Sequence, residues 1–252
     1  MRNSWFEVSG VRLPRVLVGT SPFIGAGQFG ARSYAYYRAF YNRPERVAEV
    51  ISACVELGVM GVQALPYEFI VKAIKLAQAE HGLELVVVAT IGPEDPLGDL
   101  ELYEGLDVRA VLTHGALTDV ASGPELEALL EMARETVPLA GYVTHEPMGA
   151  LKRLEAGELP RPDLIMLPFN KLGYLMDASP IEIAETLRHL GLPAIGKKVL
   201  AAGRLGPREA FEFALRFGVL SGLAIGIVSR REAEETFGAL ASILAITGWP
   251  GA

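Results

Sequence analysis

Short apolar runs alternate with amphipathic stretches along almost the whole chain. Eight runs rich in Val, Ile, Leu and Ala have the character of buried strands, at residues 15–20, 59–64, 84–90, 108–113, 139–144, 163–168, 195–201 and 222–228. Between them lie stretches with helical periodicity, at about 44–57, 67–81, 97–105, 124–136, 147–156, 180–190, 207–217 and 230–246. Several open with helix-start signals, such as Pro44 followed by Glu45 and Ser179 followed by Pro180. This alternation predicts βα units and a parallel sheet.

Eight such units in 252 residues are typical of a (β/α)8 barrel, because an open doubly wound sheet ordinarily uses fewer strands. We expect residues 1–252 to form a single TIM-barrel domain, since no linker or low-complexity tract divides the chain. Residues 5–13 resemble a short hairpin that turns at Ser9 and Gly10 and plugs the bottom of the barrel. Residues 21–43 form a long first βα loop, crowded with Tyr, Phe and Arg, that suits either a lid or a packing surface.

The charge balance narrows the kinds of partner. With 23 Lys and Arg against 30 Asp and Glu the net charge is -7, and no basic block offers a footprint for nucleic acid. A single cysteine, Cys54, fits a reducing compartment such as the cytoplasm, and no apolar run is long enough to suggest a membrane span. The expected partner is a small, anionic molecule, and an oligomer is left open.

Histidines follow two adjacent predicted strands, at the end of a barrel where active sites form. His114 follows the fourth strand and His145 the fifth. An imidazole has an unperturbed pKa of about 6.5, so it can exchange a proton near neutrality. We expect His114 to be the most important polar side chain of the site, with Gly115 leaving room for a ligand. Glu146 fits either a catalytic base or a carboxylate at a helix start.

A second candidate site follows the seventh and eighth strands, where barrels of this kind often bind phosphate. Lys197 and Lys198 are neighbours, so strand alternation lets only one face the lumen, and a lumenal lysine needs a carboxylate, phosphate or Schiff-base role. We predict that Lys198 faces the mouth and binds an anion. The predicted anion site comprises Lys198, Gly203, Arg204, Ser229 and Arg230.

Several motifs together resemble the aldo/keto reductases. These are WFEVSGVRLP at the N-terminus, RVLVGTSPF, ERVAEVISACVELGVMGVQALPY, VLTHG, DLIMLPFN, and KKVLAAGRLGPREAFEFAL with GLAIGIVSRREAEETF. The resemblance runs along most of the chain and implies a barrel that transfers hydride from NADPH to a carbonyl, with a Tyr as proton donor assisted by a Lys, an Asp and a His. His114 falls on the family's His, and Tyr67 lies one residue before the place of its Tyr.

Two members of that catalytic set are not matched. Gln63 stands in the place of the Asp, and Ile91 in the place of the Lys. A tyrosine has an unperturbed pKa of about 10 and is a poor acid at neutral pH unless a nearby cation lowers that pKa. The chain therefore resembles a divergent member, with a rearranged catalytic set.

Three function hypotheses follow. The first is an NADPH-dependent carbonyl oxidoreductase in which Tyr67 or His114 donates the proton. The second is a lyase or hydrolase in which His114, His145 and Glu146 act as acid and base or hold a Zn-like metal. The third is a noncatalytic binding protein that keeps the barrel and the anion site. An enzyme is expected, with the oxidoreductase slightly favoured.

Overall fold

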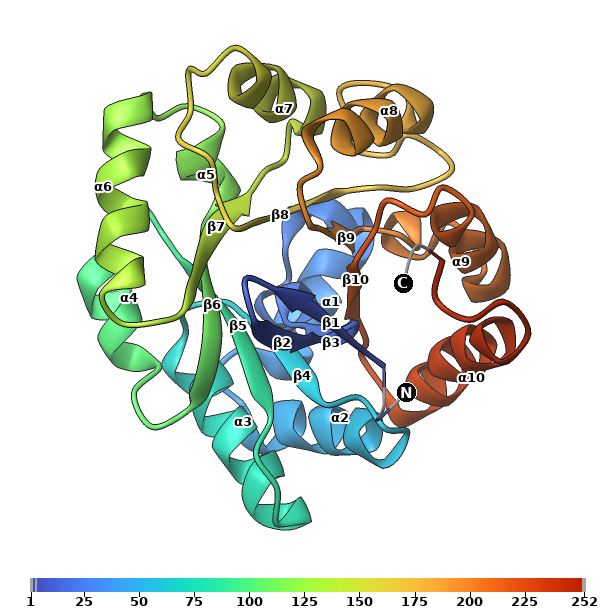
Figure 1. Ribbon diagram of the computed structural model, residues 1–252. Helices are drawn as coiled ribbons and strands as arrows, with labels where there is room; N and C mark the ends of the chain where they lie inside the picture. Colours follow the sequence, from blue (N-terminus) through green and yellow to red (C-terminus); the bar gives the residue numbers. More distant parts are fainter. Residues whose placement is uncertain (1, 3, 251–252) are drawn as a thin grey trace.

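Eight parallel strands close into a barrel in the computed structural model, which describes residue 2 and residues 4–250 (Figure 1). The strands are β3 (Val16–Gly19), β4 (Gly61–Ala64), β5 (Val86–Ile91), β6 (Asp107–Thr113), β7 (Leu139–Val143), β8 (Leu164–Pro168), β9 (Ala194–Lys197) and β10 (Gly222–Gly226). β10 pairs with β3, with Leu223 opposite Val16, and this pairing closes the sheet. The predicted (β/α)8 barrel is confirmed.

Helices form a ring around the strands (Figure 1). The main ones are α2 (Pro44–Glu56), α3 (Glu68–His81), α4 (Pro96–Leu102), α6 (Gly123–Arg134), α7 (Pro147–Glu155), α8 (Pro180–Leu190), α9 (Pro207–Leu215) and α10 (Arg230–Thr247). Their starts follow the sequence signals: Ser122 and Ser179 both form capping boxes with the glutamate three residues later. Each amphipathic helix buries its apolar side against the outer face of the sheet, which is why the barrel strands are buried on both faces.

The N-terminal hairpin lies at the amino-terminal end of the barrel. β1 (Trp5–Val8) pairs with β2 (Val11–Pro14), and the turn residues Ser9 and Gly10 have φ values of 49° and 83°. Positive φ at both central residues matches the twist of a tight hairpin. Phe6, Val8 and Leu13 join the apolar cluster of the barrel lumen, so the hairpin covers that end as the sequence predicts (Figure 1).

The long first βα loop contains helical turns. η1 (Ser21–Ile24), η2 (Gly27–Arg32) and α1 (Ser33–Phe40) occupy most of residues 21–43. Because these turns are short, they carry too few apolar repeats to show a helical period in the sequence. Phe23 and Phe40 are buried and anchor the segment, with ring centroids 5.2 Å apart, whereas Tyr34 is 70% exposed. The segment is therefore fixed at both ends.

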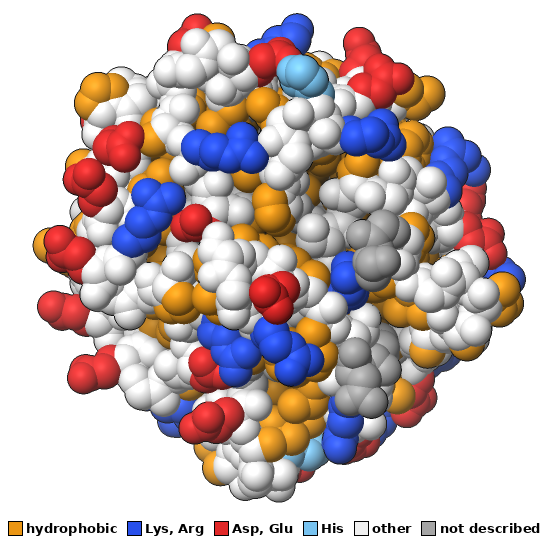
Figure 2. All heavy atoms as spheres, in the orientation of Figure 1, with side chains coloured by type: hydrophobic (Ala, Val, Ile, Leu, Met, Phe, Trp, Pro, Cys, Tyr) orange, Lys and Arg blue, Asp and Glu red, His pale blue; other side chains and the backbone are white. Residues whose placement is uncertain are grey.

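In Figure 2 acidic and basic side chains are interspersed around the rim of the amino-terminal face. Among the described residues, no helix is long and apolar enough to cross a membrane.

Gly141 in β7 provides a test of the barrel packing. A Cβ at this position would lie 2.1 Å from the carbonyl oxygen of Leu164 on β8, a backbone atom that cannot move without breaking the strand pairing. We expect Gly141→Ala to lower the free energy of unfolding by about 3 kcal/mol or more. In contrast, Gly238→Ala in α10 meets nothing within 4 Å and should raise it by roughly 0.5 to 1 kcal/mol. Urea unfolding of both variants measures the difference, and equal stabilities would contradict the packing described here.

Candidate active site

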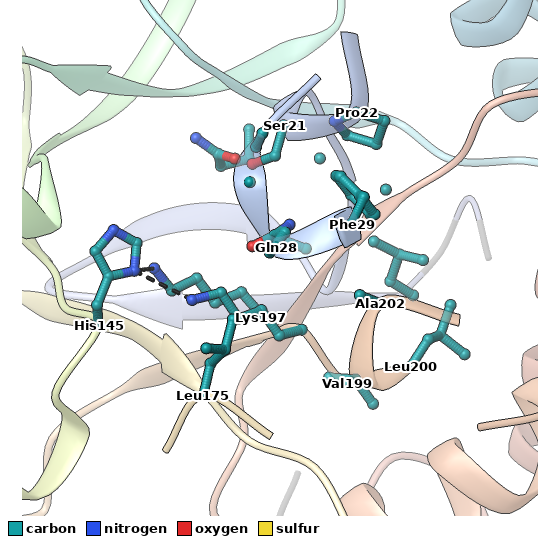
Figure 3. Close-up of a pocket in the computed structure, with 18 of the residues that line it drawn as sticks. Ser21, Pro22, Gln28, Phe29, His145, Leu175, Lys197, Val199, Leu200 and Ala202 are labelled. Carbon is teal, nitrogen blue, oxygen red and sulfur yellow. Dashed lines mark hydrogen bonds between the residues drawn. The ribbon is translucent and has the colours of Figure 1, made fainter. Parts of the chain in front are cut away.

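A cavity of about 750 Å³ opens at the carboxyl ends of the barrel strands (Figure 3). This volume is typical of small-molecule sites. Its walls come from the strand ends, from the loop after β9 and from η2 and α1 of the first βα loop. The polar and charged side chains that line it are Ser21, Gln28, Arg32, Tyr36, Gln63, Thr90, His114, His145, Glu146, Asp177, Lys197, Lys198 and Glu232.

Both lysines after β9 face this cavity. Lys197 shares the lumenal side with Ile195, two residues earlier, as strand alternation requires. Lys198 has a φ of 54°, in the left-handed region, so the strand ends at Lys197 and the alternation ends with it. The predictions that the strand continues to residue 201 and that only Lys198 faces the mouth are therefore wrong. The positive φ turns the second side chain back into the cavity.

The two amino groups meet at one imidazole nitrogen. Nζ of Lys197 lies 3.1 Å from Nδ1 of His145, and Nζ of Lys198 lies 3.2 Å from the same atom (Figure 3). The His145 ring packs against Gly115, where a Cβ would come within 2.5 Å of its Cδ2 atom. The sequence-based interpretation that Gly115 leaves room for a ligand is therefore corrected, because His145 fills that room.

His114 lies beside His145, with ring centroids 5.5 Å apart. It is the N-cap of the short α5 (Gly115–Thr118), and its Nδ1 accepts a hydrogen bond of 3.2 Å from the backbone N–H of Ala116. Since Nδ1 is an acceptor, the neutral ring carries its proton on Nε2. Burial and the charge of Lys197 lower the pKa of His114, so the neutral ring predominates at pH 7 and its Nε2–H can donate a hydrogen bond.

We define the basic cluster as His114, His145, Lys197 and Lys198. Burial and neighbouring positive charges also lower the pKa values of its other members. Burial, followed by the two lysines, lowers the pKa of His145 to about 3. Burial lowers the pKa of Lys198 to about 8, and burial together with Lys198 holds the pKa of Lys197 well below its usual value. Burial thus shifts all four groups toward their neutral forms, and Lys198 still carries most of its charge at pH 7.

Asp119 is the carboxylate behind this cluster. Its Oδ1 accepts a hydrogen bond from the Thr144 hydroxyl and its Oδ2 accepts one of 2.9 Å from the backbone N–H of His145. The charge of Asp119 raises the pKa values of both lysines, against the larger effect of burial. Its oxygens are thus already engaged in holding the start of the β7 loop.

The candidate proton donor Tyr67 lies away from the basic cluster. It is the N-cap of α3, is not part of the cavity lining and packs against Tyr41 and Phe69, with ring centroids 6.1 and 5.8 Å away. Burial raises its pKa, which makes it a weaker acid still. Ile91 packs on the helix-facing side of β5, so its position could not supply a cation to the lumen. The Tyr-centred set of the aldo/keto reductases is not assembled.

Gln63 faces the lumen and donates a hydrogen bond of 2.9 Å from Nε2 to the Thr90 hydroxyl. Both side chains are buried. This pair occupies the wall where the resemblance places an acid, and it contributes neutral hydrogen-bonding groups instead of charge.

The structure brings together only part of the predicted anion site. Lys198 and Gly203 line the cavity. Ser229 caps α10 by accepting a hydrogen bond from the N–H of Glu232, and Arg204 stacks over the Tyr174 ring at 3.9 Å. Arg230 forms an exposed ion pair with Glu56. These three residues are absent from the cavity lining.

The predicted metal ligands do not converge. His145 and Glu146 line the cavity with His114, but Nδ1 of His145 faces the two lysines and Nδ1 of His114 accepts from the backbone. Among residues 4–250, no three His, Cys, Asp or Glu side chains are grouped closely enough to hold a metal ion.

Three residues of the site were not singled out from the sequence. Lys197 directly precedes Lys198, which we predicted to be the lysine that faces the cavity. Asp119 sits in a loop with no motif around it. Arg32, in the first βα loop, donates a hydrogen bond to the Ala202 carbonyl and so joins that loop to the one after β9. The alternation from Ile195 was the signal that could have identified Lys197.

The loop after β9 has an unusual backbone. Lys198, Ala201 and Ala202 all have positive φ, at 54°, 48° and 54°, although none is glycine. Each such residue costs of order 1 kcal/mol, and such conformations are concentrated at functional sites. The loop lines the cavity directly beside the basic cluster.

Comparisons with known proteins place the fold among reductase barrels. A proposed aldo-keto reductase from Pseudomonas aeruginosa is 18% identical, with 96% of each chain covered and a TM-score of 0.69. A glycerol dehydrogenase from Gluconobacter oxydans is 14% identical, covering 97% of this chain and 96% of its own, with a TM-score of 0.56. The aldose reductase from Schistosoma japonicum is 14% identical, covering 93% and 87%, with a TM-score of 0.58.

No family model matches the sequence, and no curated protein matches it. The structural comparisons show that the chain shares the aldo-keto reductase fold over nearly its whole length. The resemblance noted in the sequence is thus confirmed at the level of the fold.

The lowered pKa of His145 predicts a pH-dependent loss of stability. The folded protein keeps this ring neutral down to about pH 3, whereas the unfolded chain takes up a proton below about pH 6.5. The unfolded state therefore binds more protons, and stability falls as pH drops through this window. His145→Gln should lose less stability than the natural chain between about pH 7 and pH 4. Urea midpoints of the two proteins across this range measure the effect, and parallel declines would contradict it.

Proposed function

We propose that this chain is an enzyme that acts on the carbonyl group of a small anionic compound bound in the cavity. The observation that supports this most strongly is the basic cluster at one end of that cavity. Lysine attracts a carboxylate or phosphate, and N–H groups polarise a carbonyl oxygen in a partly enclosed site. The neutral His114 ring can donate an Nε2–H hydrogen bond to that oxygen, and its imidazolium form can transfer a proton to it.

The shared fold supports a carbonyl as the reacting group. Solved proteins with this barrel are named as aldo-keto or aldose reductases. In this chain the proton donor of the proposal is His114, because Tyr67 lies outside the cavity lining and its pKa is raised. The first βα loop contributes Gln28, Phe29 and Arg32 to the lining, which suits a lid over the bound compound.

NADPH-dependent reduction is the more specific form of this proposal, and the chain fits the cofactor only in part. Lys198 and Gly203 line the cavity near Arg32, as a phosphate would require. The Glu232 carboxylate lines the same cavity and accepts a hydrogen bond from the N–H of Val228 just before α10, where negative charge opposes a second phosphate. This donor set suits one anionic group better than a dinucleotide, so we assign no hydride-transfer role to any residue.

Ligand binding tests the anionic part of the proposal. Pyruvate, inorganic phosphate or NADPH at millimolar concentration should bind in calorimetric titrations, and the affinity should fall with added salt. Lys198→Gln should weaken binding, because it removes a cation from the cavity. Arg230→Gln should leave binding unchanged, since this side chain pairs with Glu56 on the surface. Failure of all three ligands to bind would refute the anion site. Weaker binding by Arg230→Gln alone would instead support the anion site that was predicted from the sequence.

Replacement of His114 tests the proton donor. We expect His114→Gln to keep its urea midpoint nearly unchanged, because the residue lies at the rim as the N-cap of a four-residue helix. The same variant should lose turnover of carbonyl probes or bind pyruvate more weakly, since glutamine cannot exchange a proton near neutrality. The measurements are unfolding curves, pyruvate titrations and NADPH oxidation with pyruvate as substrate. A variant that unfolds but keeps full binding and activity per folded molecule would make His114 a structural residue.

A further inference from the structure

Lys197 and Lys198 are not arranged as a simple anion site. Two lysines that only bind an anion would each gain from staying charged and apart. Here both amino groups approach the same nitrogen of His145, and within residues 4–250 neither lysine forms an ion pair with a carboxylate. The acid whose charge acts on both lysines, Asp119, already accepts hydrogen bonds from Thr144 and from the backbone of His145. The arrangement therefore favours an uncharged amine.

Between the two, Lys197 is the better placed to be that amine. It is the last residue of β9, so its backbone is fixed by pairing with Pro168 of β8. The lumen around it is apolar, with Val143, Met166 and Ala224 lining the same cavity. Lys198 follows on the strained loop that also carries Gly203, which lies against Arg32. An amine on a rigid strand in apolar surroundings, next to a second cation, has the features of a nucleophilic lysine.

We propose that the amine of Lys197 attacks the carbonyl carbon of the bound compound and forms an imine, while Lys198 holds the compound's anionic group. This inference rests on the proposed function, and it names the reaction intermediate of the same site. The low pKa of Lys197 agrees with it, because only a neutral amine has the lone pair that attacks.

The protons balance without an added reagent. The Lys197 lone pair forms the new C–N bond as the carbonyl π electrons move to the oxygen, which accepts a hydrogen bond from Nε2–H of His114. Nδ1 of His145, 3.1 Å from Nζ, takes one proton from the new ammonium group and passes it to that oxygen, giving a hydroxyl group. The remaining N–H proton follows the same path to the hydroxyl, which leaves as water while the nitrogen lone pair forms the C=N bond. Overall the amine and the carbonyl give an imine and water, and nothing is oxidised or reduced.

An imine of this kind determines which reactions can follow. Once protonated, the C=N group withdraws electrons from the neighbouring carbon, so a bond to that carbon can break heterolytically. Proton removal, loss of carbon dioxide and carbon–carbon cleavage all belong to this class. Hydride transfer is not required for any of them, which accords with a site that lacks the full donor set for a dinucleotide.

Borohydride trapping tests the proposal directly. The protein is incubated with pyruvate, glyoxylate or glyceraldehyde 3-phosphate, reduced with sodium borohydride and analysed by intact mass and peptide mapping. We expect one reduced adduct per chain, located on Lys197. Lys197→Arg should abolish the adduct while keeping the positive charge, and Lys75→Arg, which changes a surface lysine bonded to the Glu104 carbonyl, should leave it unchanged.

The pH dependence of trapping separates a chemical role from a structural one. Lys198→Gln removes the neighbouring cation, so the pKa of Lys197 should rise and the pH at which trapping is half-maximal should move upward. An adduct on Lys198 or on surface lysines alone would overturn the inference. The same three carbonyl probes are also titrated by calorimetry, and probes that bind but give no adduct would overturn the imine and leave the proposed function standing. Neither binding nor adduct with any of the three probes would overturn both.

Discussion

Closure of the parallel sheet is the constraint on which the site depends. Since β10 pairs with β3, all eight strands end at one rim, and residues far apart in the chain become neighbours there. His114 follows β6, His145 follows β7 and Lys197 ends β9. The strand between, β8, presents the apolar side chain of Met166 to the lumen. The His145 ring therefore reaches across β8 to the lysines without meeting another charged group from that strand.

Protonation and ligand binding are coupled in such a cluster. An anion beside Lys198 would stabilise its charged form, and that charge in turn would oppose protonation of Lys197. Two adjacent lysines can thus take different roles although they have the same chemistry. The difference comes from the backbone, because Lys197 is held by the strand ladder and Lys198 by a left-handed turn.

The sequence was sufficient for the architecture and for part of the site. Buried parallel strands are short and apolar throughout, so all eight were visible, and His114 and His145 could be placed because they directly follow strands. That both lysines face the cavity could not be predicted, because the end of β9 depends on the φ of Lys198, which no local pattern reveals. Arg230 was assigned to the anion site because its partner, Glu56, lies 174 positions away in the chain. Pairings over such separations are set by tertiary structure and leave no periodic signal.

The left-handed residues after β9 also bear on how this site can evolve. At Lys198, Ala201 and Ala202 a β-branched replacement would be strained by the backbone whatever its chemistry, while glycine or asparagine would be accommodated. New specificity is therefore hard to reach by mutation of this loop. The first βα loop has no such restriction at Gln28, Phe29 or Tyr36, which line the cavity from another wall. Divergence among descendants of this chain should accordingly be concentrated in that wall, with the lysine-bearing side inherited nearly unchanged.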